Sequence, residues 1–328
     1  MLIRKLGETD IHVSVMGLGC WAIGGPYSYK DQSMGWGTVD DRESKRAIHA
    51  AIEHGFTLFD TADLYGCGHS ETVLGAALRG KRDNVVIASK FGYRIDTAKK
   101  ECTGHIQLPE DLESALDASL SRLGTDYIDI YQLHLRHCPR SLAADIQASL
   151  EVLADKGKIR AYGWSTDDAV RLSAFAPSPR FIVVQQALNV LQGSQDTLDT
   201  AEQRGLTVFC RSPLAMGLLS GEWRGKRVAT NDLRSRWNLS HGDVPAMIDM
   251  IERIRHILTE NGRTPIQGAL SWLWAKSKKT VPIPGFRNAD QVLESAGAAQ
   301  KGPLRPEQMS AIDDLVLRNF PDNPWDLR

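Results

Sequence analysis

Eight short apolar runs alternate with amphipathic stretches along this chain, and that alternation limits the folds open to it. The apolar runs cover residues 15–19, 57–62, 85–90, 127–134, 159–166, 181–187, 206–211 and 280–284. Most are separated by segments with helical periodicity, at residues 42–54, 70–79, 109–123, 142–156, 168–175 and 196–204, and a capping box starts another helix at Thr264. Continuous apolar runs are typical of parallel strands covered on both faces. The sequence therefore predicts an α/β fold, a (β/α)8 TIM barrel.

The N-terminal residues follow a different pattern. Two short runs, 2–6 and 11–15, flank a turn at residues 7–10, which predicts a β-hairpin. Three connections are longer than the rest, at residues 24–40, 92–108 and 214–243. In a barrel they are βα loops at the C-terminal face, where substrate specificity is usually built. No segment has the composition of a linker, so we expect residues 1–328 to form a single barrel domain.

Charge and cysteine content exclude several classes of function. The 328 residues carry a formal net charge of −1 and the pI is near 6.8, so neither nucleic acid nor a membrane surface is expected as a partner. The five cysteines are scattered, and no pair has metal-ligand spacing, which favours a reduced setting without a metal. No segment resembles a signal peptide or a membrane span. We expect a cytoplasmic protein.

Four polar residues stand at or just past the ends of three successive predicted strands. Asp60 ends one strand and Tyr65 follows in the next loop, while Lys90 and His134 end the two strands after it. In a parallel barrel these ends converge. A phenol has a pKa of about 10, which a nearby ammonium lowers. Tyr65 could then protonate an oxygen that hydride delivery makes negative, with Lys90 tuning it, Asp60 keeping Lys90 charged and His134 orienting a carbonyl.

Each of these residues has a simpler interpretation when it is taken alone. Asp60 could cap a turn, and Lys90 could extend into solvent. His134 could be a hydrogen-bonded structural histidine, and Tyr65 could pack on the barrel rim. Together these interpretations require four coincidences at consecutive strand ends, so the sequence favours the catalytic one.

The surroundings of these residues resemble the aldo-keto reductase family over nearly the whole chain. The segment from Gly55 through Asp60 and Tyr65 to Gly75 resembles the first family signature, and the strand ends at Lys90 and at 132–134 match the other catalytic positions. The resemblance implies a barrel closed by a hairpin at its N-terminal end. It also implies a general acid/base at Tyr65. The chain is similar to the branch that includes potassium-channel β subunits and bacterial general aldo-keto reductases.

A hydride donor is required, because no side chain supplies hydride. The glycine-rich string at residues 17–24 fails the spacing of a dinucleotide-binding fingerprint. The resemblance implies instead that NADP (NADPH) is held by Ser165 and Gln185 at its carboxamide and by Arg287 at its 2′-phosphate, in forked geometry. The alternative for Arg287 is a solvated loop arginine. The other residues expected to bind the cofactor are Cys20, Trp21, Asp60, Arg211, Ser212, Pro213, Leu214, Gly217, Gly285, Gln291 and Glu294.

Several positions depart from the family pattern. Arg211 stands where many relatives have an aromatic side chain that stacks on the nicotinamide, and a planar guanidinium could stack there too. Thr166 and Ser295 stand where asparagine is frequent. Glu222 stands where some relatives have a phosphate-binding lysine, which weakens the expectation of a cofactor clamp at that point.

Three functions remain open at this stage. The first is an NADPH-dependent oxidoreductase that reduces a small aldehyde or ketone, or runs in reverse on an alcohol. The second is a redox-sensing binding or regulatory subunit, with the same barrel docked on a partner. The third is a metal enzyme using His134, His137 and Cys138, which the poor ligand geometry of a loop without a carboxylate disfavours. The sequence leaves the substrate and the oligomeric state open, a homo-oligomer included.

Overall fold

Eight parallel strands form the centre of the computed structural model, which describes residues 1–221, 223 and 228–319. They follow one another around the sheet in chain order. Gly17 N and Gly19 N donate to Pro282 O and Pro284 O, both at 2.9 Å, and so join the first strand to the last. The predicted barrel is confirmed. Its strands are β3 (Leu18–Gly19), β6 (Leu58–Asp60), β7 (Val86–Phe91), β10 (Ile128–Leu133), β11 (Ile159–Ser165), β12 (Phe181–Asn189), β14 (Thr207–Arg211) and β15 (Thr280–Pro282).

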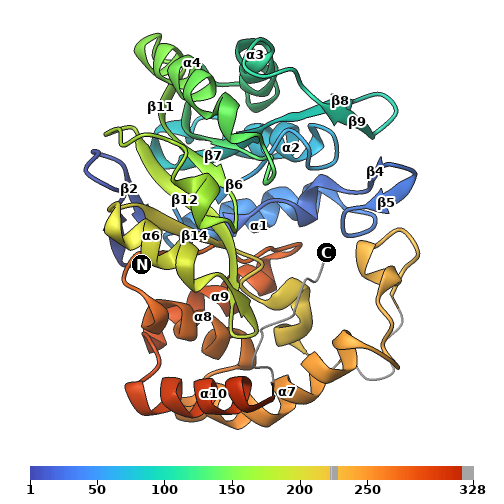
Figure 1. The fold of residues 1–328 in the computed structure, drawn as a ribbon. Helices are drawn as coiled ribbons and strands as arrows, with labels where there is room; N and C mark the ends of the chain where they lie inside the picture. Colours follow the sequence, from blue (N-terminus) through green and yellow to red (C-terminus); the bar gives the residue numbers. More distant parts are fainter. Residues whose placement is uncertain (222, 224–227, 320–328) are drawn as a thin grey trace.

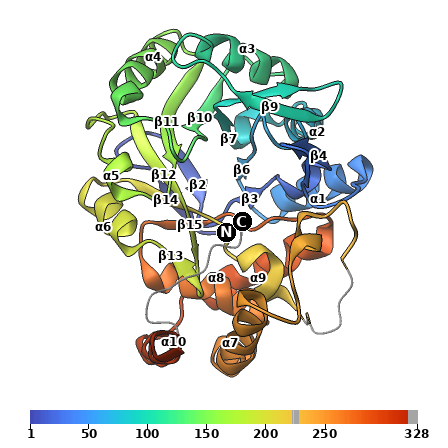
Figure 2. The same ribbon diagram turned by 45° about the vertical axis from the view of Figure 1, so that its right-hand side comes forward.

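Helices between successive strands form the outer layer, which surrounds the strands in Figure 2. α7 (Asp243–Leu258) and α10 (Pro306–Asn319) lie outside this ring and pack against each other. The predicted helix at 168–175 is wrong in its length, since it ends at Leu172. Pro177 disfavours helical geometry at the residue before it, so the chain cannot stay helical toward that point. The ring helices are α1 (Asp41–Glu53), α2 (His69–Ala77), α3 (Leu112–Leu123), α4 (Ala143–Asp155), α5 (Ala169–Leu172), α6 (Gln195–Gln203), α8 (Pro265–Lys276) and α9 (Ala289–Lys301).

The long loops carry secondary structure that the sequence pattern did not indicate. The first contains β4 (Tyr27–Tyr29) and β5 (Gln32–Met34), and the second contains β8 (Tyr93–Asp96) and β9 (Glu101–His105). β4 pairs with β9, so the two loops form one four-stranded sheet beside the barrel (Figure 1). In the third loop, Leu233 N donates to Gly35 O at 2.9 Å. The loops after the first and seventh barrel strands are thereby joined.

The N-terminal hairpin closes one end of the barrel, as predicted. Its strands, β1 (Ile3–Lys5) and β2 (His12–Ser14), lie at the end opposite the long loops in Figure 1. The side chains of Leu6, Ile11 and Val13 belong to one buried cluster with the side chains that fill the barrel interior. Those interior residues are Leu58, Val86, Ala88, Ile130, Ala161, Ile182, Val183, Phe209, Val281 and Ile283.

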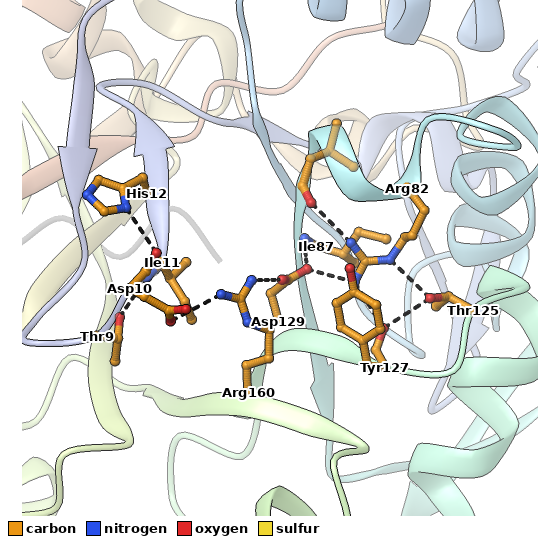
Figure 3. Close-up of polar contacts among 11 residues, drawn as sticks. Thr9, Asp10, Ile11, His12, Arg82, Ile87, Thr125, Tyr127, Asp129 and Arg160 are labelled. Atoms are coloured by element: carbon orange, nitrogen blue, oxygen red, sulfur yellow. Dashed lines mark hydrogen bonds and ion pairs between the residues drawn. The ribbon is translucent and has the colours of Figure 1, made fainter.

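A buried carboxylate also ties this end together (Figure 3). Asp129 on β10 is ion-paired with Arg82 and Arg160, each with an N–O distance of 2.7 Å, and it accepts Ile87 N at 2.9 Å. Arg160 reaches on to Asp10 in the hairpin turn, at 3.2 Å. Asp129 is buried and Asp10 is exposed. Removal of the Asp129 carboxylate would therefore leave the arginines without their buried partner and would lower the free energy of unfolding far more than removal of the Asp10 carboxylate.

Among the helices of the described ranges, none is long and apolar enough to cross a membrane.

Substitution of a single hairpin residue tests whether the hairpin contributes to the barrel core. Ile11 is 1% exposed and Ile3 is 55% exposed. We expect Ile11→Ala to lower the free energy of unfolding by about 2–5 kcal/mol, the usual cost of truncating a buried isoleucine, and Ile3→Ala to change it by less than about 0.5 kcal/mol. Urea denaturation followed by circular dichroism measures both. Equal effects of the two variants would show that the hairpin is not part of the core.

Candidate active site

A cavity of about 800 Å³ lies at the C-terminal ends of the barrel strands. Asp60 at the end of β6, Tyr65 in the loop after β6 and His134 just past β10 line it. Aromatic side chains from the long loops form other parts of its wall, among them Trp36 and Tyr93. The parallel barrel therefore gathers these groups at one place, as the strand-end pattern predicted.

The Lys90 ammonium is the centre of the group. It is fully buried on β7, and its Nζ donates to Asp60 Oδ2 at 2.6 Å, Thr61 O at 2.8 Å and Tyr65 OH at 3.1 Å. An ammonium has three protons, so these three acceptors satisfy it completely. The same Nζ lies 4.7 Å from the centre of the Tyr65 ring. The phenol is thus in direct contact with a desolvated positive charge.

Two glutamine side chains hold the other oxygen of the Asp60 carboxylate. Gln185 Nε2 on β12 donates to Asp60 Oδ1 at 2.7 Å, and Gln132 Nε2 on β10 donates to it at 3.2 Å. Asp60 is only 2% exposed. A buried charge is tolerated when it is paired and its remaining lone pairs are hydrogen-bonded. The carboxylate is consequently fixed from three directions by side chains of three strands.

A tight turn after β6 places Tyr65. Tyr65 N donates to Ala62 O at 3.2 Å, and Gly68 N donates to Asp63 O at 2.7 Å just before α2. Gly66 has a φ of +61°, and a Cβ there would lie 1.8 Å from Gly24 O. Only glycine fits both the backbone conformation and this close approach. Gly66 therefore lets the Tyr65 turn pack against the first long loop.

The electrostatics of Tyr65 differ from the sequence-based expectation. Burial is the largest influence on this phenol and raises its pKa, while the Lys90 ammonium opposes burial and Asp60 adds to it, so the net pKa lies above 10. Burial also disfavours the Lys90 ammonium, but Asp60 and Tyr65 outweigh it and raise the pKa of Lys90. Lys90 lowers the pKa of Tyr65, as expected, but its effect is smaller than that of burial. Tyr65 is consequently a protonated phenol at neutral pH.

His134 contributes a neutral imidazole. Burial is the main reason that its pKa lies well below 6.5, and the charges of Lys90, Arg136 and Arg211 lower it further. Its ring lies edge-on to Tyr65, with a centroid distance of 5.8 Å, and to Tyr93, at 5.3 Å. Within the described ranges, His134 Nδ1 is buried without a hydrogen-bond partner. A neutral imidazole beside the phenol can hydrogen-bond a bound oxygen.

Most residues predicted to bind a cofactor lie around the same cavity. Trp21 stacks on Tyr65 with a centroid distance of 5.7 Å and an interplanar angle of 20°. Cys20 and Glu294 are not among the residues that line the cavity, and Cys20, which directly follows β3, is fully buried. The predicted residues that do line it are Trp21, Asp60, Ser165, Gln185, Arg211, Ser212, Pro213, Leu214, Gly217, Gly285, Arg287 and Gln291.

The atypical positions have defined surroundings. The Arg211 guanidinium, at the end of β14, is ion-paired with Asp167. Thr166 is buried, and its hydroxyl accepts Asp168 N at 3.2 Å. Ser295 lines the cavity where asparagine was the expected family residue. Glu222 lies outside the residues that the structure describes.

Arg287 follows β15 and faces two cavities. It lines the large one and also a smaller cavity of about 370 Å³, whose other charged residues are Asp40 and Glu43. Its guanidinium donates to Trp36 O at 3.1 Å and to Thr38 O, which holds the first long loop beside α9. Asn288 caps α9, its side chain accepting Gln291 N at 3.0 Å. A guanidinium beside a helix N-terminus provides a site suited to phosphate.

Sequence reasoning missed two features of the site. The contact of Gln132 with Asp60 was not predicted, because strand register decides which side chains on neighbouring strands meet. Tyr93 was missed because it lies in a short polar strand without strong periodicity. For the metal alternative, His137 is exposed and Cys138 is buried, and the described part of the chain contains no group of three or more His, Cys, Asp or Glu residues that could hold a metal ion.

Comparisons with known proteins agree along the chain. The model of the aldo/keto reductase family matches residues 15–317. The NADH-specific methylglyoxal reductase of Escherichia coli (strain K12) is 31% identical over 305 residues, which are 89% of this chain and 92% of that protein. The structure of the glycerol dehydrogenase AKR11B4 from Gluconobacter oxydans has a TM-score of 0.82 and 28% identity, covering 99% of this chain and 98% of that one. An aldo-keto reductase from Klebsiella pneumoniae in complex with NADPH has a TM-score of 0.69 and 26% identity, with coverages of 100% and 98%.

Proposed function

The chain belongs to the aldo/keto reductase family, and we propose that it reduces the carbonyl group of a small aldehyde or ketone to an alcohol, reversibly and with NADPH. The observation that carries this proposal is the contact of Lys90 Nζ with both Asp60 and Tyr65 OH at the cavity. The aldo-keto reductase relatives support an oxidoreductase of small carbonyl compounds as the reaction class. The roles of the individual residues are our own assignment.

Tyr65 is the proposed general acid. A carbonyl oxygen gains negative charge as it is reduced, and a phenol within hydrogen-bond reach can give it a proton. Because the pKa of Tyr65 lies above 10, the phenol holds this proton at neutral pH. The Lys90 ammonium, 3.1 Å from Tyr65 OH, stabilises the tyrosinate left after transfer. His134, as a neutral donor, orients the carbonyl beside Tyr65.

The cofactor site is proposed on the residues that face the cavity. When bound, the nicotinamide supplies the hydride. In the described part of the chain the buried Ser165 hydroxyl has no hydrogen-bond partner, and with the Gln185 amide it fits the carboxamide. Arg287 is assigned to the 2′-phosphate on the chemistry of its guanidinium. The NADPH complex of the Klebsiella pneumoniae relative supports a nicotinamide cofactor, while the Escherichia coli relative is NADH-specific. Asp40 and Glu43 in the adjoining cavity oppose a phosphate, so the preference for NADPH over NADH rests on Arg287.

A regulatory role on a partner is the alternative function. The Lys90, Asp60 and Tyr65 contacts favour turnover, and they are compatible with a redox-sensing subunit that keeps the same site. Oxidation of NADPH with an aldehyde separates the two functions. We further propose that residues 1–328 act as one domain in the cytoplasm.

Removal of the Tyr65 hydroxyl tests its role as the acid. We expect Tyr65→Phe to lower kcat/KM for aldehyde reduction by about 10²–10⁴-fold, the usual contribution of a general acid, while NADPH binding changes by less than about threefold. Tyr127→Phe is the control, because Tyr127 lies near the Asp129 ion pairs at the other end of the barrel (Figure 3). Stopped-flow or steady-state NADPH absorbance gives the rates. Full activity in Tyr65→Phe would refute the mechanism.

The pH dependence follows from the two pKa directions. Tyr65 stays protonated below its raised pKa, and His134 stays neutral above its lowered pKa. We expect kcat/KM for reduction at saturating NADPH to vary by less than about threefold between about pH 6 and pH 9. Alcohol oxidation needs the tyrosinate, so its rate should rise over the same range. A basic limb of reduction near pH 7–8 would contradict the assignment, because the Tyr65 phenol would then lose its proton below its ordinary pKa rather than above it.

The cofactor preference is tested at Arg287. A charge-assisted hydrogen bond contributes about 1.5–3 kcal/mol, so Arg287→Ala should lower the ratio of NADPH to NADH affinity by about 10–100-fold. Arg305→Ala is the matched control, because Arg305 pairs with Glu260 away from the cavity. Fluorescence titration with each cofactor measures both affinities. An unchanged ratio in Arg287→Ala would show that this arginine does not bind the 2′-phosphate.

A further inference from the structure

The arginines that line the cavity differ in whether the guanidinium group already has a hydrogen-bond or ion-pair partner in the protein. Among the described lining residues are five arginines, against the carboxylates Asp60 and Asp243. Four of the five guanidinium groups donate to acceptors of the protein itself. Arg211 pairs with Asp167, and Arg234 donates to the Asp232 carboxylate at 2.9 and 2.7 Å. Arg236 donates to Gln32 Oε1 at 2.5 Å and Ser33 O at 3.0 Å, and Arg287 donates to Trp36 O at 3.1 Å. The fifth is Arg136. Across residues 1–221, 223 and 228–319, its guanidinium has neither a hydrogen bond nor an ion pair.

The backbone beneath Arg136 is firmly held. His134 N donates to Phe91 O at 2.8 Å, and Leu135 O accepts Trp164 Nε1 at 3.0 Å. The Leu135 side chain is buried against Gly92, where a Cβ would lie 2.7 Å from Leu135 Cγ. Leu135 therefore points into the protein, while His134 and Arg136 on either side of it line the cavity. The guanidinium is carried on the same hydrogen-bonded segment as His134.

Arg136 is on the wrong side of the barrel for the proposed cofactor phosphates. Arg136 follows β10, whereas the Arg287 segment follows β15, and in the strand order β15-β14-β12-β11-β10 these strands are four steps apart. In an eight-strand barrel that separation places them on opposite sides. Near Arg136 the cavity is lined by Tyr93 and His134. Burial raises the pKa of Tyr93 to about 12, and the charge of Arg136 opposes that rise. Burial lowers the pKa of His134, and the charges of Lys90 and Arg136 lower it further.

We propose that Arg136 binds a carboxylate on the carbonyl substrate, so that the site prefers aldehydes or ketones that carry a carboxylate on an apolar or aromatic body. This inference rests on the proposed function, and it assigns a substrate class to the same site. A guanidinium offers two parallel N–H donors that match a carboxylate. The aromatic wall formed with Tyr93 and Trp21 accommodates the body of such a substrate. Arg136 is a specificity-determining residue in this scheme, and Tyr65 remains the acid.

An aldehyde with a carboxylate and its uncharged methyl ester, which share the same aromatic body, together test the proposal. The probes are 4-carboxybenzaldehyde and its methyl ester, methyl 4-formylbenzoate, each reduced with NADPH. We expect the wild-type protein to favour the carboxylate at least about tenfold in kcat/KM, and R136Q to lower that ratio at least about tenfold. R140Q is the matched control, because Arg140 is exposed and does not line the cavity, and it should keep the wild-type ratio. A wild-type ratio near one, or an unchanged ratio in R136Q, overturns the inference.

A binding measurement separates failure of this inference from failure of the proposed function. Quenching of tryptophan fluorescence by 4-carboxybenzaldehyde reports binding, since Trp21, Trp36 and Trp237 line the cavity. We expect R136Q to bind this aldehyde at least about tenfold more weakly than the wild-type protein, and the ester to show no such loss. Absence of turnover of both aldehydes would refute the proposed function, while the binding ratio would still decide the role of Arg136. Equal binding of the carboxylate by wild type and R136Q would refute that role.

Discussion

A fully buried ammonium can persist only where every one of its protons has an acceptor, and this requirement at Lys90 organises the site. The three acceptors come from Asp60, the backbone at Thr61 and Tyr65, which follow one another in the same strand and loop. Asp60 in turn needs donors for its second oxygen, and Gln132 and Gln185 supply them from two other strands. Breaking such a buried pair costs about 3–5 kcal/mol. The contacts of Lys90 with Asp60 and Tyr65, which the proposed proton transfer uses, are therefore also the contacts that stabilise the buried charge of Lys90.

The same burial decides which protonation states are available. Removal of water raises the pKa of the phenol and lowers that of the imidazole, so Tyr65 holds a proton and His134 stays neutral. Lys90 works against burial at Tyr65 without overcoming it. The free protein therefore already has the protonation states that the proposed reduction requires. Oxidation of an alcohol requires Tyr65 as the tyrosinate, which this environment disfavours at neutral pH.

Local pattern was sufficient to predict the barrel, the N-terminal hairpin and the convergence of Asp60, Lys90 and His134, because parallel strands must end at one face. That the hairpin closes one end of the barrel followed from the family resemblance. Local pattern was insufficient where the register of neighbouring strands or the course of a loop decides which distant side chains meet. Gln185 contacts Asp60 across 125 residues, and Arg211 pairs with Asp167 across 44. The sheet formed by β4 and β9 was missed for the same reason, since each hairpin is short and polar and is completed by the other. The direction of the Tyr65 pKa needed the depth of burial, which no sequence pattern supplies.

The hairpin covers the end of the barrel opposite the cavity, and its apolar side chains belong to the cluster that fills the barrel interior. This cluster is separate from the one between the strands and the helices. Within residues 1–221, 223 and 228–319 there are thus two apolar clusters, and the one that includes the hairpin shares only Ile283 with the described cavity wall. Free-energy changes at sites without common partners add almost independently. Changes at the hairpin can therefore offset a loss of stability caused by new side chains on the cavity rim. Substitutions on the cavity rim that change the substrate can therefore be combined with stabilising substitutions in the hairpin, so that the fold is retained.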